Sequence, residues 1–207
     1  MEIARWGKHN YRGFPWRYVR DPYWTAVSEI LLRRTRAEQV SKVYSMIRDK
    51  YPSPSSMEQI QCDEPIILSL GLHTRTGTLR DFARAVVNKY SGIIPRDRNK
   101  LLALPGLGDY SVSAIRVFAF GYNDPLIDTN TVRIISRVNG ITHTDSLRRS
   151  VSIHSIYSEM VGSRDPVTFG YSILDFGAIV CRPVPQCSIC DLRKMCYYSI
   201  NLHNTEE

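Results

Sequence analysis

Three observations predict an all-α fold. Apolar residues recur every three or four positions in segments such as 24–45 and 79–90, the spacing that places them on one face of a helix. Strand-like alternation and hairpin signals between β-branched runs are scarce. Prolines and glycines break the chain at intervals that leave helices of ordinary length. These breaks fall at 14–16, 21–22, 51–54, 94–95, 105–108, 123–125 and in the segment after Cys181.

The composition favours an anionic partner. The 207 residues suffice for one large domain or two small ones with a real core. Lys and Arg number 27 against 20 Asp and Glu, which gives a formal net charge of +7 and a pI near 9.3. Nucleic acid is the commonest anionic partner of such a protein, although many basic proteins bind no polyanion. No apolar run approaches membrane-spanning length, and we expect no membrane association.

Residues 104–108 (Leu-Pro-Gly-Leu-Gly) lie between two helix-like segments, 96–103 and 109–120. We interpret them as a tight hairpin, because Gly106 and Gly108 let the backbone turn sharply. The second helix begins there with the positive end of its dipole, which suits a phosphate. Gly-x-Gly is nevertheless a common signal, and a plain connection between helices is the better interpretation of this motif alone.

Asp128 stands about twenty residues after the hairpin, between apolar residues and the start of a helical segment. A carboxylate in that place is either a helix N-cap or a functional acid. The local sequence favours the N-cap, and the two roles are compatible.

Four cysteines near the C-terminus follow the pattern Cys181-x5-Cys187-x2-Cys190-x5-Cys196. Four thiolates at short spacing indicate a metal site. Zinc usually takes two close pairs, and only Cys187 and Cys190 form one, so a compact [4Fe–4S] cluster is favoured over zinc. Structural disulfides are disfavoured because the sequence shows no secretory signal. The fifth cysteine, Cys62, is expected to be a buried apolar residue.

The hairpin, Asp128 and the cysteine quartet together resemble the endonuclease III superfamily of helix-hairpin-helix DNA glycosylases. Within it, residues 14–17, 20–23 and 29–35 look most like the thymine/uracil mismatch glycosylases called MIG, and the MutY-type adenine glycosylases come next. The resemblance implies a [4Fe–4S] cluster on the four cysteines and double-stranded DNA with a mismatched or damaged base as the partner. It also implies a monomer, a downstream abasic-site endonuclease, and a nucleoid-associated, cytoplasmic location of the prokaryotic type.

The same resemblance implies two all-α lobes. The first is a six-helix barrel domain over residues 22–121, with the helix-hairpin-helix at about 96–120. The second combines residues 1–21 with 122–207 and carries the cluster loop at 181–196.

Three residues match catalytic positions of the superfamily. Asp128 corresponds to the catalytic aspartate, which stabilises the positive charge that builds on the sugar as the glycosidic bond breaks. Glu29 matches a glutamate that helps to protonate or orient the departing base. Tyr110 stands where enzymes with lyase activity have a lysine, and a phenol cannot form a Schiff base. We therefore expect a monofunctional glycosylase that leaves an abasic site without nicking the strand.

DNA contacts are expected from three segments. Hairpin residues Leu104, Gly106 and Gly108 would bind phosphate, and Arg33 and Arg34 match a segment that contacts the gap and the orphan base in relatives. Residues 72–75 match the wedge loop, from which His73 and Arg75 are the candidates. A solvated helix face remains the alternative for the two neighbouring arginines, and a plain surface position remains the alternative for His73.

The sequence departs from the family pattern at three places. The first cysteine spacing is x5 where x6 is usual, so an empty or zinc-filled loop stays possible. Asp109 follows the hairpin where Lys or Arg is commoner, which places an acid beside the expected phosphate site. The wedge loop is one residue shorter than in MIG-type proteins. Two other functions remain open: an adenine glycosylase acting opposite guanine or 8-oxoguanine, and a non-catalytic DNA-binding protein with a cluster.

Overall fold

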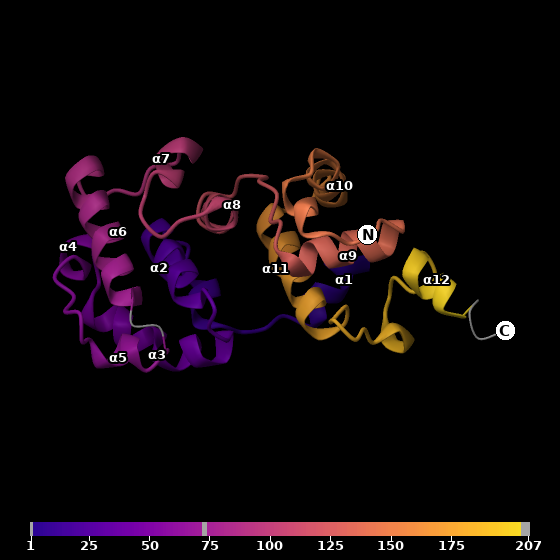
Figure 1. Ribbon diagram of the computed structural model, residues 1–207, viewed down its shortest axis with the longest axis horizontal. Coiled ribbons are helices and arrows are strands. Elements are labelled where there is room, and N and C mark those ends of the chain that lie inside the picture. The colour runs from indigo at the N-terminus through magenta and orange to yellow at the C-terminus, as the bar shows by residue number, and fades with distance from the viewer. Residues whose placement is uncertain (1, 72–73, 204–207) are drawn as a thin grey trace. The chain divides into compact units, whose positions relative to one another are not determined.

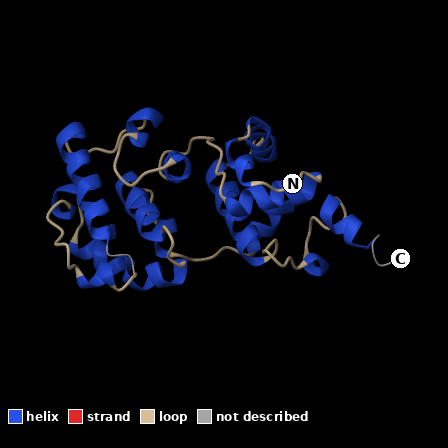
Figure 2. Ribbon diagram, viewed as in Figure 1, coloured by secondary structure: helices blue, strands red, loops and turns tan. Residues whose placement is uncertain are grey.

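The computed structural model describes residues 2–71 and 74–203, and these residues form helices, turns and loops without a β-strand (Figures 1 and 2). The predicted all-α fold is therefore confirmed for the described chain. No helix in that part of the chain has both the length and the apolar character needed to cross a membrane.

The chain forms two compact units. We call residues Gly13–Phe120 the hairpin unit, and Met1–Arg12 with Gly121–Glu207 the cysteine unit. The segment 13–21, expected in the second lobe, instead belongs to the hairpin unit. The reason is local packing: the 3-10 turn η1 (Pro15–Tyr18) contacts the two helices that follow it, and the Trp16 ring meets Tyr44 edge-on.

The described part of the hairpin unit contains seven α-helical segments, of which two are single turns, where six helices were expected. Helix α2 begins at a proline in its first turn, and the Asp21 carboxylate accepts a hydrogen bond from the Trp24 amide at 2.8 Å. The seven are α2 (Pro22–Leu32), α3 (Ala37–Lys50), α4 (Pro54–Met57), α5 (Pro65–Leu68), α6 (Thr74–Tyr90), α7 (Arg98–Leu102) and α8 (Asp109–Phe118).

Helix α2 is the centre of the hairpin unit and contacts α3, α6 and α8 (Figure 1). From Tyr23 to Leu31 every residue of α2 is buried except Glu29, which is half-buried. A helix that is apolar on all sides belongs in a core. An acid on a helix that is buried on nearly all sides is unusual.

The cysteine unit is built around α11 (Pro166–Ile179), which contacts α1 (Glu2–His9) and α9 (Thr129–Asn139). The N-terminal segment is held by Arg12, whose amide and Nε donate to the buried Asp175 carboxylate at 3.0 and 2.5 Å. The remaining elements are η2 (Asp145–Arg149), α10 (Val151–Val161), η3 (Cys187–Ile189) and α12 (Tyr197–His203).

Candidate nucleic-acid interface and active-site residues

The hairpin between α7 and α8 presents an open helix start. Gly106 has φ +81°, and a Cβ there would stand 2.5 Å from Thr78 Cγ2, so only glycine fits. Gly108 is the N-cap of α8 and supplies no side-chain cap. The first amides of a helix lack helical partners and attract anions. Leu104 is 2 % exposed, so its side chain holds the hairpin in the core and leaves only its backbone for DNA.

The acid beside this helix start is partly neutralised. The Asp109 side chain is 85 % exposed, and its Oδ1 accepts a hydrogen bond from Arg98 Nη2 at 3.1 Å. An acid in the first turn also interacts favourably with the helix dipole. Asp109 therefore stabilises α8, and Arg98 reduces the repulsion that the carboxylate would exert on a phosphate.

We expect Gly106→Ala to destabilise the protein by about 1–3 kcal/mol and to weaken DNA binding, because the methyl group meets Thr78 and the φ is unfavourable. Gly92→Ala is the matched control: Gly92 has φ +82°, but no atom lies within 4 Å of its Cβ position. Urea unfolding and DNA titrations compare the two variants. Equal destabilisation in both variants, with unchanged DNA affinity in Gly106→Ala, would show that close packing of the hairpin contributes neither to stability nor to DNA binding.

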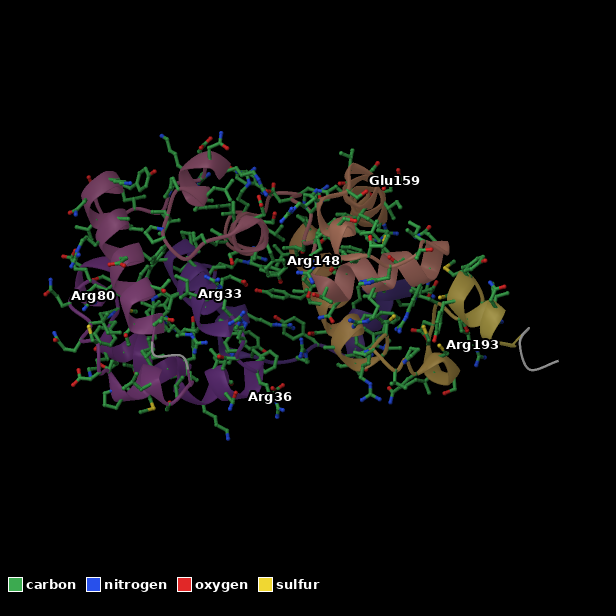
Figure 3. The ribbon with its side chains drawn as sticks, viewed as in Figure 1. Arg33, Arg36, Arg80, Arg148, Glu159 and Arg193 are labelled. Carbon is green, nitrogen blue, oxygen red and sulfur yellow. The ribbon has the colours of Figure 1, made fainter. Side chains whose placement is uncertain are left out.

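The loop between α2 and α3 presents three arginines, Arg33, Arg34 and Arg36, and all three are exposed. Figure 3 shows Arg33 and Arg36 in this region of the hairpin unit. Arg33 Nη1 donates to the Gly106 carbonyl at 3.3 Å, which ties the loop to the hairpin. Arg34 has φ +56°. The loop thus brings exposed arginines next to the hairpin, and cationic side chains beside free backbone amides suit contacts with phosphates.

The structure buries the Arg75 side chain, whereas the sequence led us to expect it at the DNA surface. The residue is 3 % exposed, and its Nη2 donates to the Arg33 carbonyl at 2.7 Å and to Thr35 Oγ1 at 2.6 Å. Burial lowers the pKa of Arg75, and the nearby Arg33 charge lowers it further. Leu72 and His73 lie outside the described residues.

Glu29 and Tyr110 are on the two helices that pack together in the hairpin unit, α2 and α8. Both side chains are half-buried. Tyr110 lies in the first turn of α8, directly after the hairpin. The packing of α2 on α8 therefore positions an acid and a phenol in the unit that carries the hairpin.

Asp128 begins helix α9 in the cysteine unit. Its Oδ1 accepts a hydrogen bond from the Thr131 amide at 2.7 Å, and its Oδ2 accepts one from Asn130 Nδ2 at 3.1 Å. The local prediction of an N-cap is confirmed. The residue is only half-buried. Its carboxylate is thus held in a fixed orientation and still reaches solvent, which suits an acid that must meet a reacting group.

A chain of hydrogen bonds joins Asp128 to Cys181, the first residue of the cysteine segment (residues 181–196). Arg133 Nη2 donates to Asn130 Oδ1 at 2.8 Å and to the Gly177 carbonyl at 2.9 Å, and Arg133 Nε donates to the Cys181 carbonyl at 2.8 Å. A Cβ on Gly177 would stand 2.6 Å from Asn130 Cβ. Asn130 and Arg133, which sequence reasoning missed, therefore orient the carboxylate.

We expect Asn130→Ala to lower the rate of the step that uses Asp128 by about tenfold, because one carboxylate oxygen loses its orienting donor. The helix start survives, since the Thr131 amide still reaches the carboxylate. Asn139→Ala, an exposed change on the same helix, is the control. Single-turnover rates measure the effect on the reaction, and melting temperatures measure the effect on stability. An unchanged rate in Asn130→Ala would contradict the orienting role.

The four cysteines are free thiols, and Cys196 is the buried one. Arg137 contacts two of them: its Nη1 donates to Cys181 Sγ at 3.5 Å, and its carbonyl accepts from Cys196 Sγ at 3.4 Å. Burial raises the pKa of Cys187 and of Cys190, and the charges of Cys181 and Cys196 raise both further. The structure therefore ties Cys181 and Cys196 to helix α9 through Arg137.

The donor set agrees in kind and number with an iron–sulfur ligand set. Within residues 2–71 and 74–203, no three His, Cys, Asp or Glu side chains are close enough to hold a metal ion as they stand. The fifth cysteine corrects an expectation: Cys62 is exposed, and its Sγ accepts a hydrogen bond from Arg80 Nη1 at 3.2 Å.

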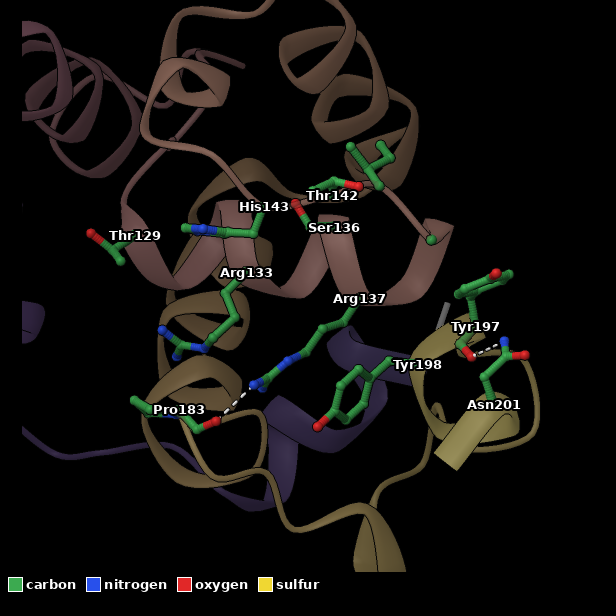
Figure 4. A pocket seen from close by; sticks show the side chains of 12 residues that line it. Thr129, Arg133, Ser136, Arg137, Thr142, His143, Pro183, Tyr197, Tyr198 and Asn201 are labelled. Atoms are coloured by element: carbon green, nitrogen blue, oxygen red, sulfur yellow. Dashed lines mark hydrogen bonds between the residues drawn. The ribbon is translucent and has the colours of Figure 1, made fainter. Parts of the chain in front are cut away.

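A cavity of about 670 Å³ lies beside α9 and α12 in the cysteine unit (Figure 4). Arg133 and Arg137 project from α9 along it, and Arg137 Nη2 donates to the Pro183 carbonyl at 2.7 Å. None of the four cysteines is among its lining residues. Arg133 and Arg137 therefore hold the start of the cysteine segment against α9 through hydrogen bonds to its backbone carbonyls.

Three features identify a helix-hairpin-helix protein of the DNA-binding type. They are the hairpin with its uncapped helix start, the arginines of the loop between α2 and α3, and the separate unit with four free cysteines. The chain belongs to the HhH-GPD superfamily of base excision DNA repair proteins, and the model of that family matches residues 27–152. The predicted family is therefore confirmed.

Curated relatives and solved structures agree with this membership. A thymine/uracil-DNA glycosylase of Methanothermobacter thermautotrophicus is 36 % identical over 191 residues, which cover 90 % of this chain and 86 % of the relative. An adenine DNA glycosylase of Mycolicibacterium smegmatis is 29 % identical, with 93 % and 67 % covered. The solved structure of a thermostable thymine-DNA glycosylase matches with a TM-score of 0.90 and 33 % identity, covering 96 % of this chain and 94 % of that one. An endonuclease III–DNA complex shares the fold, with a TM-score of 0.82 at 23 % identity and coverage of 98 % and 94 %.

Proposed function

We propose that this protein is a monofunctional DNA glycosylase that removes thymine or uracil opposite guanine. The observation that carries the proposal is the Asp128 carboxylate, half-exposed at the start of α9 and oriented by the Thr131 amide and by Asn130. The similarity over most of the chain to thymine/uracil-DNA glycosylases supports this choice of base.

The reaction replaces the bond between the base and the sugar C1′ with a bond from C1′ to a water oxygen. Positive charge builds on the sugar before the water attacks, and Asp128 stabilises it and orients the water. The base departs with the bonding electron pair. Glu29 and Tyr110 donate hydrogen bonds or a proton to it, Glu29 in its protonated form. The proton that the water loses balances the one that the base acquires.

Access to the bond requires that the nucleotide leave the helical stack. Extrusion costs a few kcal/mol and costs least at a mispair, which favours thymine or uracil opposite guanine over thymine opposite adenine. The hairpin amides and Arg33 bind the DNA backbone, and Arg34 meets the orphan guanine, whose two acceptors on one edge suit a guanidinium.

A [4Fe–4S] cluster would be held by Cys181, Cys187, Cys190 and Cys196. Such a cluster would fix the fold of residues 181–196. This fold would place Arg182, Arg193 and Lys194, all exposed, where they can meet phosphates. We further propose that the protein acts as a monomer in the cytoplasm, and that an abasic-site endonuclease takes up its product.

The proposal is tested with labelled duplexes that contain T·G, U·G, A·G or A·8-oxoguanine, with and without hot alkali. Cleavage of the T or U strand only after alkali is the expected result. Cleavage of only the A strand would move the protein to the adenine branch, a candidate that the similarity to adenine DNA glycosylases keeps open. Absence of base loss on all four duplexes would favour a protein that only binds DNA.

The missing lysine gives a separate prediction. We expect wild-type protein to give no borohydride-trapped adduct with substrate DNA, and we expect Tyr110→Lys to give one, because an amine at the start of α8 forms a Schiff base with the sugar. Tyr122→Lys, in the loop after α8, is the control and should trap nothing. Adducts are read on denaturing gels. Efficient trapping by the wild type would contradict the monofunctional assignment.

A further inference from the structure

The loop between α2 and α3 holds Arg34 in a conformation that residues with a side chain rarely adopt. Its φ is +56°, and its side chain is exposed. Such a conformation costs free energy and persists only where the surroundings enforce it, commonly at functional sites. The contacts that hold Arg34 in this conformation are therefore informative.

Arg75 holds the loop on both sides of Arg34. A single atom, Arg75 Nη2, donates to the carbonyl of the preceding residue, Arg33, at 2.7 Å and to Oγ1 of the following residue, Thr35, at 2.6 Å. Arg33 in turn donates from Nη1 to the Gly106 carbonyl at 3.3 Å. Two elements thus hold the loop in place: α6 through Arg75, and the hairpin through the Gly106 carbonyl.

The burial of Arg75 is not explained by stability. The residue is 3 % exposed, and within the described chain its partners are a carbonyl and a hydroxyl, while its Nη1 is buried without a hydrogen bond. Burial lowers the pKa of Arg75, and the neighbouring Arg33 charge lowers it further. A buried cation without a carboxylate partner costs free energy. An apolar side chain of similar length would cost less, so the arginine serves the loop.

We propose that Arg75 is a positioning residue that presents Arg34 to the base opposite the extruded nucleotide and thereby sets the preference for guanine. This inference rests on the proposed function. Arg75 touches neither the substrate nor the reacting atoms. It acts through the backbone of Arg33 and the hydroxyl of Thr35, and the left-handed backbone at Arg34 is the conformation that it maintains.

The test is a double-mutant cycle with Arg75→Met, Arg34→Ala and the double variant. The primary measurement is the dissociation constant for duplexes that carry a tetrahydrofuran abasic analogue opposite guanine or opposite adenine. We expect the preference for guanine to fall by about tenfold in each single variant. The double variant should lose no more than either single one, because both changes remove the same contact. Arg80→Met, which removes another arginine from α6, is the control and should keep the preference.

Two results would overturn the inference. One is an unchanged preference for guanine in Arg75→Met, and the other is an additive loss in the double variant. Because binding to the analogue needs no chemistry, a wild type that binds with a guanine preference but releases no base would refute the proposed function and still allow this test.

Arg75→Lys and Thr35→Val complete the design in case Arg75→Met does not fold. The lysine keeps a cation, and Thr35→Val removes one acceptor of Arg75 while keeping the shape of the side chain. Each should reduce the guanine preference with little change in melting temperature. Arg34→Gly should raise the melting temperature, because glycine accepts a positive φ, and should lose the preference. Retention of the preference in both Thr35→Val and Arg75→Lys would contradict the positioning role.

Discussion

Asp128→Asn is expected to lower the rate of base release by on the order of 10²–10³-fold, because the amide removes the negative charge that we propose stabilises the sugar in the transition state. The fold should be unaffected. Asparagine is as good an N-cap as aspartate, and its side-chain oxygen can still accept the Thr131 amide that now bonds to Asp128 Oδ1 at 2.7 Å. The variant therefore separates the N-cap role of this residue from its proposed catalytic role.

The measurements are single-turnover base release, DNA affinity and melting temperature. Asp128→Ala is the companion variant: it should lose activity and also about 1 kcal/mol of stability, because the cap is removed as well. An Asp128→Asn protein that releases base at the wild-type rate would show that Asp128 is only a cap.

Cys196→Ser is expected to abolish the proposed cluster and with it the order of residues 181–203. Cys196 is the buried member of the quartet, and its Sγ donates to the Arg137 carbonyl on α9. Metal binding and folding of such a segment are coupled, so the loss of one ligand should loosen the whole segment. DNA affinity should fall by roughly tenfold or more, because basic side chains in the segment lose their positions. The hairpin unit should stay folded.

Cys62→Ser is the matched control, because Cys62 is exposed and belongs to the other unit. Iron and sulfide analysis measures the loss of the cluster. Hydrogen exchange over residues 181–203 measures the loss of order, and DNA titration measures the loss of affinity. Full iron content in Cys196→Ser would remove this residue from the ligand set. Zinc in place of iron in the wild-type protein would contradict the cluster assignment.

The features that the sequence predicted correctly are local. The hairpin depends on Gly106 and Gly108, which are close in sequence, and the N-cap role of Asp128 depends on the helix that follows it. Residue types at short spacing determine both, so they could be recognised without a structure. The all-α fold follows for the same reason, from apolar periodicity within single helices.

The features that were missed depend on contacts between distant residues. Arg75 is 42 residues from the carbonyl that it binds, and Arg133 is 44 and 48 residues from two of its acceptors. Nothing in the neighbouring sequence distinguishes a buried arginine from an exposed one. The exposure of Cys62 and the membership of residues 13–21 in the hairpin unit are likewise set by tertiary packing.

The most direct test of the central claim is to identify the free product by chromatography after incubation of the protein with T·G and U·G duplexes. We predict release of free thymine and free uracil in amounts equal to the alkali-labile sites formed, from strands that stay intact before alkali. Strand breaks without alkali, or alkali-labile sites without a free base, would contradict hydrolysis of the glycosidic bond by this protein.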